Sequence, residues 1–345
     1  MTRALITGVT GCVGSNLASA LLRQGVEVVG LCHPSAPTLA IEGLPIRRVV
    51  GDILDPASLL PALEGADWVF HAAAIADDWK HPAERVYRTN VSGTRNVLEA
   101  ALRAGVQRFI YVSSAAALGG PRPWQPLLDE TSQFNFAPAE WPYAHSKHLA
   151  EQAVQEYVAR GLPALVVQPA PILGPADSAV ISGQLILRAV RGELFPLPHG
   201  GTNYVDVRDA AAAMITAARS GVVGRRYLLA GHNLSHLHTL GAIGDALGVP
   251  IRYLPVPRRA LPLLEGAFGL AERVGLRLPV NRVRVHLSGQ YLYYDNQRAV
   301  AELGLRPRPF EQSVEDAARW YFDHGLLAEW RKPAWRMDLA LRSSE

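Results

Sequence analysis

The sequence has few cysteines, few lysines and no block of like charge. Its 345 residues include two cysteines, Cys12 and Cys32, which stand neither in a C-x-x-C pair nor beside histidines at metal-ligand spacing. We therefore expect no disulfide framework and no structural zinc, and a reducing compartment is the simple interpretation. The net charge is +3 and the arginines are scattered, so nothing indicates nucleic acid as a partner.

Long apolar runs are also missing. The most apolar helical stretch covers residues 261–276, but Glu265, Glu272 and Arg273 interrupt it. It falls short of the roughly 20 apolar residues that a membrane span needs. Contact with a membrane surface stays an alternative for this stretch. The N-terminus lacks the basic start and long apolar segment of a signal peptide, which favours a cytoplasmic location.

The first half of the chain alternates between short apolar runs and helical patterns. The runs cover 4–7, 26–31, 46–50, 68–72, 109–112 and 164–167, and the helical patterns cover 13–22, 56–63, 86–104 and 144–160. Continuous apolar runs are typical of strands that are buried on both faces. Right-handed βαβ units then predict an α/β fold with a doubly wound parallel sheet, the Rossmann architecture.

The alternation ends after Pro169. Helical patterns at 178–191, 235–247, 262–274 and 314–322 indicate a smaller mixed α/β substrate lobe, while 203–207 and 226–230 are predicted as strands that return to the main sheet. The predicted dinucleotide-binding domain therefore comprises 1–170 plus 203–231. The predicted substrate-binding lobe comprises 171–202 plus 232–335.

Three glycines, Gly8, Gly11 and Gly14, stand between the first strand and the first helix, in the stretch TGVTGCVG (7–14). Glycine permits the tight turn and lets backbone N–H groups approach a pyrophosphate. The helix N-terminus adds donors and a positive dipole for the phosphates. The position of this turn favours a dinucleotide site over a purely structural turn.

The second strand is followed by Leu31-Cys32-His33-Pro34, without an acidic residue. A carboxylate there would bind the ribose 2′-hydroxyl of NAD, so its absence favours NADP slightly over NAD. His33 is a candidate phosphate contact, or simply a surface histidine. Asp52, after the third strand, is a candidate partner of the adenine amino group. Its alternative role is helix capping, for which Asp55 before Pro56 is better placed.

Tyr143 and Lys147 form a Y-x-x-x-K pair at the start of a predicted helix. Residues four apart share a helix face, and an ammonium beside a phenol favours the phenolate. The pair therefore predicts an acid/base tyrosine with a lowered pKa. Ser113 and Ser114 end the fifth strand, where the ligand crevice of such a sheet lies, and one of them is a candidate to bind the substrate oxygen. Capping of the strand end is the alternative.

Taken together, these motifs resemble the extended short-chain dehydrogenase/reductases of the NAD-dependent epimerase/dehydratase family. The matching stretches are TGVTGCVG (7–14), GDILD (51–55), HAAA (71–74), TNVSGTRNVLEAA (89–101), YVSSAAALG (111–119), YAHSK (143–147), NYVDVRDAAAAM (203–214) and YDNQRAVAELGLRPRPFEQSVEDAARWY (294–321). The resemblance implies Ser114, Tyr143 and Lys147 as the catalytic residues. It implies cofactor contacts at Gly8, Thr10, Gly11, Cys12, Val13, Gly14, His33, Asp52, Ile53, Ala72, Ala73, Ala74, Asn90, Tyr143, Lys147, Pro169 and Ile172.

The chain departs from this family at two positions. The family often has Arg-Pro where Gln168-Pro169 stands, which leaves the contacts there open, and it often has histidine where Asp206 stands. LCHP (31–34) is similar to the LVRP of the dihydroflavonol-reductase-like and 3-beta-hydroxysteroid-dehydrogenase-like branches. The family often pairs through two long helices, here 86–104 and 144–160, which implies a homodimer.

We predict an enzyme that transfers hydride between NADP or NAD and a small-molecule carbonyl or alcohol. The alternative is a nucleotide-sugar epimerase or dehydratase that returns the hydride internally, for which Arg188, Arg191, Arg208 and Arg282 are candidate diphosphate ligands. A binding protein that senses the cofactor is a third hypothesis, against which the Tyr143–Lys147 pair argues. The aromatic residues of the loop 119–142 either overhang the pocket, which would suit an apolar substrate, or pack onto their own domain.

Overall fold

The computed structural model describes residues 2–138, 140–274, 276 and 282–327 of the chain. Its largest element is a parallel main sheet of seven strands in the order β11-β7-β5-β4-β1-β2-β3. This order confirms the predicted doubly wound sheet. The strands are β1 (Arg3–Thr7), β2 (Glu27–Cys32), β3 (Arg47–Val50), β4 (Trp68–His71), β5 (Arg108–Val112), β7 (Ala164–Pro169) and β11 (Arg226–Leu229).

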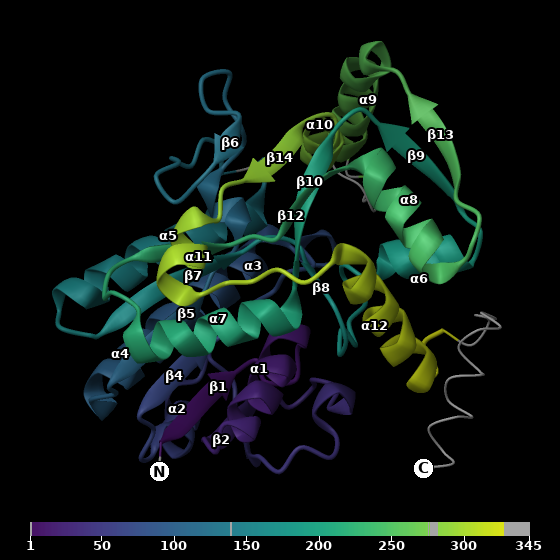
Figure 1. Cartoon of the computed structure of the whole chain (residues 1–345). Helices are drawn as coiled ribbons and strands as arrows, with labels where there is room; N and C mark the ends of the chain where they lie inside the picture. Colours follow the sequence, from purple (N-terminus) through teal and green to yellow (C-terminus); the bar gives the residue numbers. More distant parts are fainter. Residues whose placement is uncertain (1, 139, 275, 277–281, 328–345) are drawn as a thin grey trace, which may run out of the picture.

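Helices cover both faces of the main sheet (Figure 1). On one face α1 packs against α7, and on the other α4 packs against both α2 and α5. Successive residues of β1 enter opposite cores, Leu5 on one side and Ala4 and Ile6 on the other, which explains its unbroken apolar run. These helices are α1 (Cys12–Arg23), α2 (Pro56–Leu63), α3 (Ala83–Tyr87), α4 (Thr94–Ala104), α5 (Pro142–Ala159) and α7 (Val207–Ser220).

Local sequence signals set several helix ends. The Asp55 side chain accepts a hydrogen bond from the Ala57 N–H at 3.1 Å, which confirms Asp55 as the cap of α2. Gly105 ends α4 in a left-handed conformation at φ +66°, as predicted. The predicted helix 86–104 is interrupted by one π-helical turn, Arg88–Gly93, which carries Asn90. Such turns are frequent at functional sites.

The smaller lobe has two sheets of its own. One sheet has the order β12-β10-β14-β6, with β8 paired to β10, and the other pairs β13 with β9. β10 therefore lies in the lobe, and the prediction that 203–207 returns to the main sheet is wrong. The edge of the main sheet is taken by β11 on β7, whereas Asn203 ties β10 to Asn233 of β12 at 2.8 Å. The strands are β6 (Leu127–Leu128), β8 (Ile172–Leu173), β9 (Leu194–Pro198), β10 (Gly201–Asp206), β12 (His232–Ser235), β13 (Arg252–Val256) and β14 (Tyr291–Tyr294).

Six helices of the described residues complete this part of the chain: α6 (Gln184–Val190), α8 (His236–Leu247), α9 (Leu261–Arg273), α10 (Arg282–Ser288), α11 (Gln297–Leu303) and α12 (Phe310–Asp323). α6 is shorter than the predicted helix 178–191, because Ala176 and Val180 have left-handed backbone at φ +67° and +49°. The lobe core gathers Phe310 and Tyr321 with α6 and α8. The domain boundaries stay a prediction, and residue 335 lies outside the described residues. Among the described helices, none is both long and apolar enough to cross a bilayer.

Candidate active site

The glycine turn between β1 and α1 brings the backbone close to the end of β4. Gly8 has φ +70°, and a Cβ there would lie 2.7 Å from the Ala73 Cα. A Cβ at Gly14 would lie 2.7 Å from the Val9 Cα and would also collide with the Gly8 carbonyl. Gly11 is the N-cap of α1 and has no side chain to bond the first N–H groups of that helix. The turn therefore offers main-chain donors and a helix N-terminus, which fits the pyrophosphate of a dinucleotide.

A chain of hydrogen bonds behind this turn joins β1, β4 and α4 through His71, which the sequence did not single out. Its Nδ1 lies 2.6 Å from Thr7 Oγ1, and its Nε2 lies 2.9 Å from Thr94 Oγ1. The Thr94 hydroxyl donates to the Asn90 carbonyl, so Nε2 is the protonated nitrogen of His71. Complete burial, and then the charge of Lys147, lower the pKa of His71 to about 3. His71 is therefore a neutral structural link.

Asn90 fastens the loop after β4 to α5. Its Oδ1 accepts from the Ile75 N–H at 2.8 Å, and its Nδ2 donates to the Ile75 carbonyl and to Ser146 Oγ, both at 3.0 Å. Ser146 in turn donates to the Tyr143 carbonyl at 2.7 Å. Asn90 therefore positions the first turn of α5 through its side chain. The cofactor contact implied for Asn90 stays a prediction.

His33 and Asp52 meet at the ends of β2 and β3. His33 Nε2 lies 3.6 Å from Asp52 Oδ2, while Nδ1 accepts from the Ser35 N–H at 3.2 Å. Both side chains are more than one-third exposed, so they are open to an adenosine group. Ile53 is buried beside Gly93, where a Cβ would approach its Cδ1 to 2.6 Å. The structure thus gathers these three predicted residues after the ends of β2 and β3.

The remaining predicted contacts lie around the same strand ends. Thr10, Cys12 and Val13 belong to the turn and the first helical positions after β1. Ala72 and Ala74 follow β4, and Pro169 and Ile172 flank the passage from β7 to β8. The Cys12 thiol contacts the Pro175 carbonyl at 3.6 Å, and burial raises its pKa. Cys12 therefore acts here as a packing residue between α1 and the loop at Pro175.

Tyr143 lies in the first turn of α5, next to the end of β5. The Ser114 side chain lies near its hydroxyl and acts on its pKa, and Ser114 caps the turn after β5 by accepting from the Ala116 N–H at 3.2 Å. Burial raises the pKa of Tyr143, Ser114 opposes this rise, and the charge of Asp78 adds to it. The predicted lowering of the Tyr143 pKa is therefore wrong for the residues described. The physical reason is that the desolvation of the partly buried phenol and the charge of Asp78 outweigh the effect of Ser114.

Lys147 is almost completely buried one turn further along α5. Its Nζ donates to the Val112 carbonyl at 2.9 Å and lies 5.0 Å from the centre of the Tyr111 ring. Burial lowers the pKa of Lys147 from 10.5 to about 8, although the charge of Glu151 opposes this. Tyr143 and Lys147 thus share one face of α5 beside the last residue of β5, as the spacing predicts.

Glu151, one turn beyond Lys147, is a buried carboxylate that the sequence analysis missed. Its Oε1 accepts from Ser113 Oγ at 2.5 Å and from Gln168 Nε2 at 2.8 Å, and its Oε2 lies 3.7 Å from Arg226 Nη1. Ser113 is therefore committed to Glu151, which leaves Ser114 as the serine that faces Tyr143. Its i, i+4 spacing from Lys147 was the available signal. Burial raises the pKa of Glu151, against the hydrogen bonds and the two cations.

A second missed carboxylate, Asp78, connects α5 with the lobe. It accepts from the backbone N–H groups of Tyr143 and Trp79, and it pairs with Arg284 of α10 at 3.2 Å. The Arg284 guanidinium lies 4.0 Å from the centre of the Trp79 ring. Burial raises the pKa of Asp78, while Arg284 and the backbone bonds oppose this. Asp78 was hidden because its partner lies more than 200 residues away in the sequence.

The aromatic residues of the loop 119–142 make two kinds of contact: some pack against α5, and one borders Tyr143. Phe134 stacks on His148 of α5 with a centroid distance of 4.7 Å and packs edge-on against Phe136. These two rings therefore pack the loop onto its own domain. Trp141 precedes α5 and lies 6.4 Å from the Tyr143 ring, so it borders the active site. Trp124 is largely exposed.

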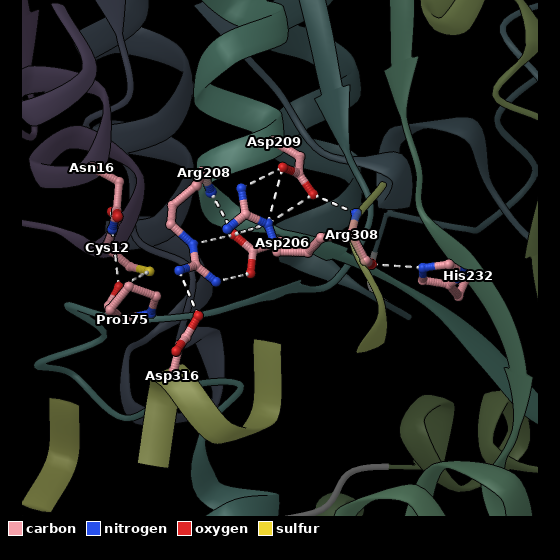
Figure 2. Close-up of polar contacts among 9 residues, drawn as sticks. All are labelled: Cys12, Asn16, Pro175, Asp206, Arg208, Asp209, His232, Arg308 and Asp316. Atoms are coloured by element: carbon pink, nitrogen blue, oxygen red, sulfur yellow. Dashed lines mark hydrogen bonds and ion pairs between the residues drawn. The ribbon is translucent and has the colours of Figure 1, made fainter. Parts of the chain in front are cut away.

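Figure 2 shows that two arginines at the start of α7 and before α12 are committed to carboxylates. Arg208 pairs with Asp206 at 2.7 Å and with Asp316 of α12 at 2.6 Å, and Arg308 pairs with Asp209 at 2.6 Å. Burial by itself would raise the pKa of Asp206, but the bonds from Arg208 hold it low. Asp206 stands where the family often has histidine, and it joins α7 to the lobe.

The comparisons with known proteins agree with this geometry. The family model described as "NAD dependent epimerase/dehydratase family" matches residues 4–230. A putative dihydroflavonol 4-reductase of Synechocystis is 35% identical over 333 residues, which cover 93% of this chain and 95% of that protein. Sterol demethylase protein B of Methylococcus capsulatus is 30% identical over 334 residues, which cover 94% and 99%.

A solved structure has the same fold across almost the whole chain. It is described as a nucleoside-diphosphate-sugar epimerase from Pseudomonas aeruginosa, is 25% identical, covers 94% of this chain and 98% of its own, and has a TM-score of 0.78. The predictions of a Rossmann sheet and of an NAD(P)-dependent enzyme are confirmed. The chain belongs to the NAD-dependent epimerase/dehydratase family of extended short-chain dehydrogenase/reductases.

Proposed function

We propose that the enzyme is a reductase or dehydrogenase that exchanges hydride with a separate, apolar carbonyl or alcohol substrate, with Tyr143 as its acid/base. The observation that carries the proposal is the meeting of Ser114, Tyr143 and Lys147 at the end of β5 and the start of α5. This meeting point lies at the carboxyl ends of the parallel strands, where such sheets bind ligands.

The cofactor would be held by the glycine turn, the N-terminus of α1 and the small residues after β4. A nicotinamide bound there supplies or accepts the hydride. Ser114 orients the substrate oxygen by hydrogen bonding, and Tyr143 donates a proton to that oxygen in reduction or removes it in oxidation. Lys147 holds a positive charge beside the developing phenolate and thereby stabilises it. Asn90 and Asp78 keep the first turn of α5 in place.

Three observations favour net redox chemistry over a nucleotide-sugar epimerase. Arg208, a candidate diphosphate ligand, is committed to Asp206 and Asp316. Arg188, another candidate, pairs with Glu193 at 2.9 Å and lies over the Phe195 ring. Two of the reported relatives have names that indicate reduction or an apolar substrate, dihydroflavonol reductase and sterol demethylase.

Finer features of the enzyme belong to the same proposal. We propose a preference for NADP, which is supported by the exposed His33 at the end of β2 and by the lack of a carboxylate there. We further propose a homodimer through the faces of α4 and α5 that point away from the sheet, and a cytoplasmic location.

The test is a panel of apolar ketones and aldehydes assayed with NADH and NADPH, and of the corresponding alcohols and of nucleotide sugars assayed with NAD+ and NADP+, all followed at the nicotinamide absorbance. Net cofactor consumption is expected with an apolar carbonyl, whereas product formation from a nucleotide sugar without net consumption would refute the proposal. Tyr143→Phe should lower kcat by at least about 100-fold, the size of a general acid/base effect. Tyr87→Phe, which removes a hydroxyl bonded to His145, is the matched control and should retain activity.

A further inference from the structure

The segment that leads from β13 through α9 to α10 has a helix that exposes an apolar stripe to solvent. We name the described residues of this segment, 252–274 and 282–288, the arm. Figure 1 shows α9 and α10 beyond the lobe sheet that contains β10 and β14, at the end of the molecule away from α1 and α2. The arm reaches the active site through Arg284 of α10, the partner of Asp78.

The solvent-facing stripe of α9 is entirely apolar. Leu263, Ala267, Leu270 and Val274 follow one another at intervals of four, three and four residues, which places them on one face. Leu263 is 76% exposed, Leu270 62% and Val274, directly after the helix, 67%. A surface helix of a globular protein normally turns such a stripe toward the core.

The other side of α9 carries its contacts with the protein. Glu265 pairs with His286 of α10 at 3.0 Å, and a Cβ at Gly269 would lie 3.2 Å from the Arg282 side chain. Glu265 therefore points to α10, while Leu263 and Leu270 point to water. Burial of apolar surface would not leave these two leucines exposed in an isolated chain.

Further apolar and basic side chains border the stripe in sequence. Tyr253 and Leu254 of β13 are about half exposed. Arg252, in the same strand, and Arg258 and Arg259, immediately before α9, are exposed as well. An apolar stripe bordered by arginines is the composition of helices that lie in the plane of a bilayer interface.

We propose that the arm docks on an anionic lipid bilayer, with the apolar stripe of α9 at the boundary between headgroups and acyl chains and the arginines on the lipid phosphates. An anionic surface satisfies the exposed leucines and the arginines together. A second copy of the chain would bring the same arginines with it, and so would cover the leucines without neutralising the charge. The proposal does not depend on the proposed reaction.

The first experiment is sedimentation of the full chain with sucrose-loaded vesicles of phosphatidylcholine and phosphatidylglycerol in a 3:1 ratio. The wild type is expected to sediment with these vesicles and to bind pure phosphatidylcholine vesicles at least about fivefold more weakly, because each arginine near an anionic surface contributes about fivefold. The double variant Leu263→Gln/Leu270→Gln should bind the anionic vesicles at least about tenfold more weakly. The matched control Leu60→Gln/Leu237→Gln alters two leucines that are exposed on α2 and α8 and should bind like the wild type.

A second variant, Arg258→Gln/Arg259→Gln, tests the charge separately. Its binding to anionic vesicles should fall by about 25-fold, and its remaining binding should depend less on salt. Thermal unfolding of all variants verifies that they are folded. Equal sedimentation of the wild type and the leucine variant would overturn the proposal. So would a change from dimer to monomer in the leucine variant by size-exclusion chromatography, since the stripe would then be an interface between copies.

Discussion

Replacing the buried Lys147 by methionine should stabilise the protein at neutral pH while it removes activity. The pKa of Lys147 is lowered from 10.5 to about 8, which corresponds to about 3 kcal/mol of unfavourable free energy for the charged form in the folded state. That figure already includes the attraction to Glu151, which raises the pKa. Lys147→Met removes the charge and keeps an unbranched apolar side chain.

The variant also loses the hydrogen bond from Nζ to the Val112 carbonyl, which contributes about 1 kcal/mol. The net expectation is a gain of about 2 kcal/mol in the free energy of unfolding. With an unfolding entropy of about 0.7 kcal/mol/K for a chain of this length, Tm should rise by about 3 °C at pH 7. Activity should be lost, because nothing then holds a positive charge beside the phenolate of Tyr143.

The pH dependence of this gain is the sharper test. Below pH 8 the lysine is charged in both the folded and the unfolded states, so the wild type bears the full cost. Between pH 8 and 10.5 the folded protein loses the proton first, and wild-type stability rises by about 1.4 kcal/mol per pH unit. The advantage of Lys147→Met should therefore vanish near pH 9.5. Scanning calorimetry of both proteins at pH 7 and 9.5 measures it, and Lys80→Met, at an exposed lysine, is the control.

A difference in Tm that is the same at both pH values would refute this account. A lower Tm for Lys147→Met at pH 7 would refute it as well, because the charge of Lys147 would then be favourable in the folded state.

Three further predictions concern Glu151, the glycine turn and His71. Glu151→Gln should lower the pKa of Lys147, so the alkaline limb of the kcat/KM profile should move to lower pH while activity at pH 6 changes little; an unmoved limb would contradict the coupling. Gly14→Ala should abolish cofactor binding measured by fluorescence titration, because its Cβ would meet the Val9 Cα at 2.7 Å, whereas Gly11→Ala, with 3.5 Å to the Gly8 oxygen, should retain at least part of the binding. The pKa of His71 is lowered from 6.5 to about 3, so stability should fall as pH decreases from 6.5 toward 3, and acid unfolding of His71→Gln should be less steep over this range.

The sequence was sufficient to predict the main sheet because each of its strands carries its own signal. Burial on both faces requires a continuous apolar run, which the chain has at β1, β2, β4, β5 and β7. The edge strand β3 is Arg-Arg-Val-Val and largely exposed, and its only signal is Ile46 with Val49 and Val50. The strands of the lobe lack such a local sequence signal. β8 and β6 have two residues each, and β10 differs from a main-sheet strand only in its partners, such as the pairing of Asn203 with Asn233. Those partners come from distant segments, so periodicity gives no information about them.

In the candidate site, too, features set by local spacing could be predicted and features set by distant contacts could not. Tyr143 and Lys147 could be predicted because one helix face brings them together at a fixed spacing. The pKa of Tyr143 could not be predicted, since it depends on burial and on Asp78, which reaches α5 from the loop after β4. The choice between Ser113 and Ser114 also required the structure, because it is the bond to Glu151 that turns Ser113 away from the tyrosine.

Gln168 of β7 and Arg226 of β11 both contact Glu151, the carboxylate that acts on the charge of Lys147. Gln168 stands where the family often has arginine, and it gives Glu151 a hydrogen bond but no charge. Its Oε1 is buried without a hydrogen-bond partner among the described residues. The strand next to β7 is β11, whose Arg226 places its guanidinium 3.7 Å from the other oxygen of Glu151. We infer that Arg226 supplies from β11 the cation that is missing at position 168, and that Glu151 thereby remains a carboxylate able to support the charge of Lys147.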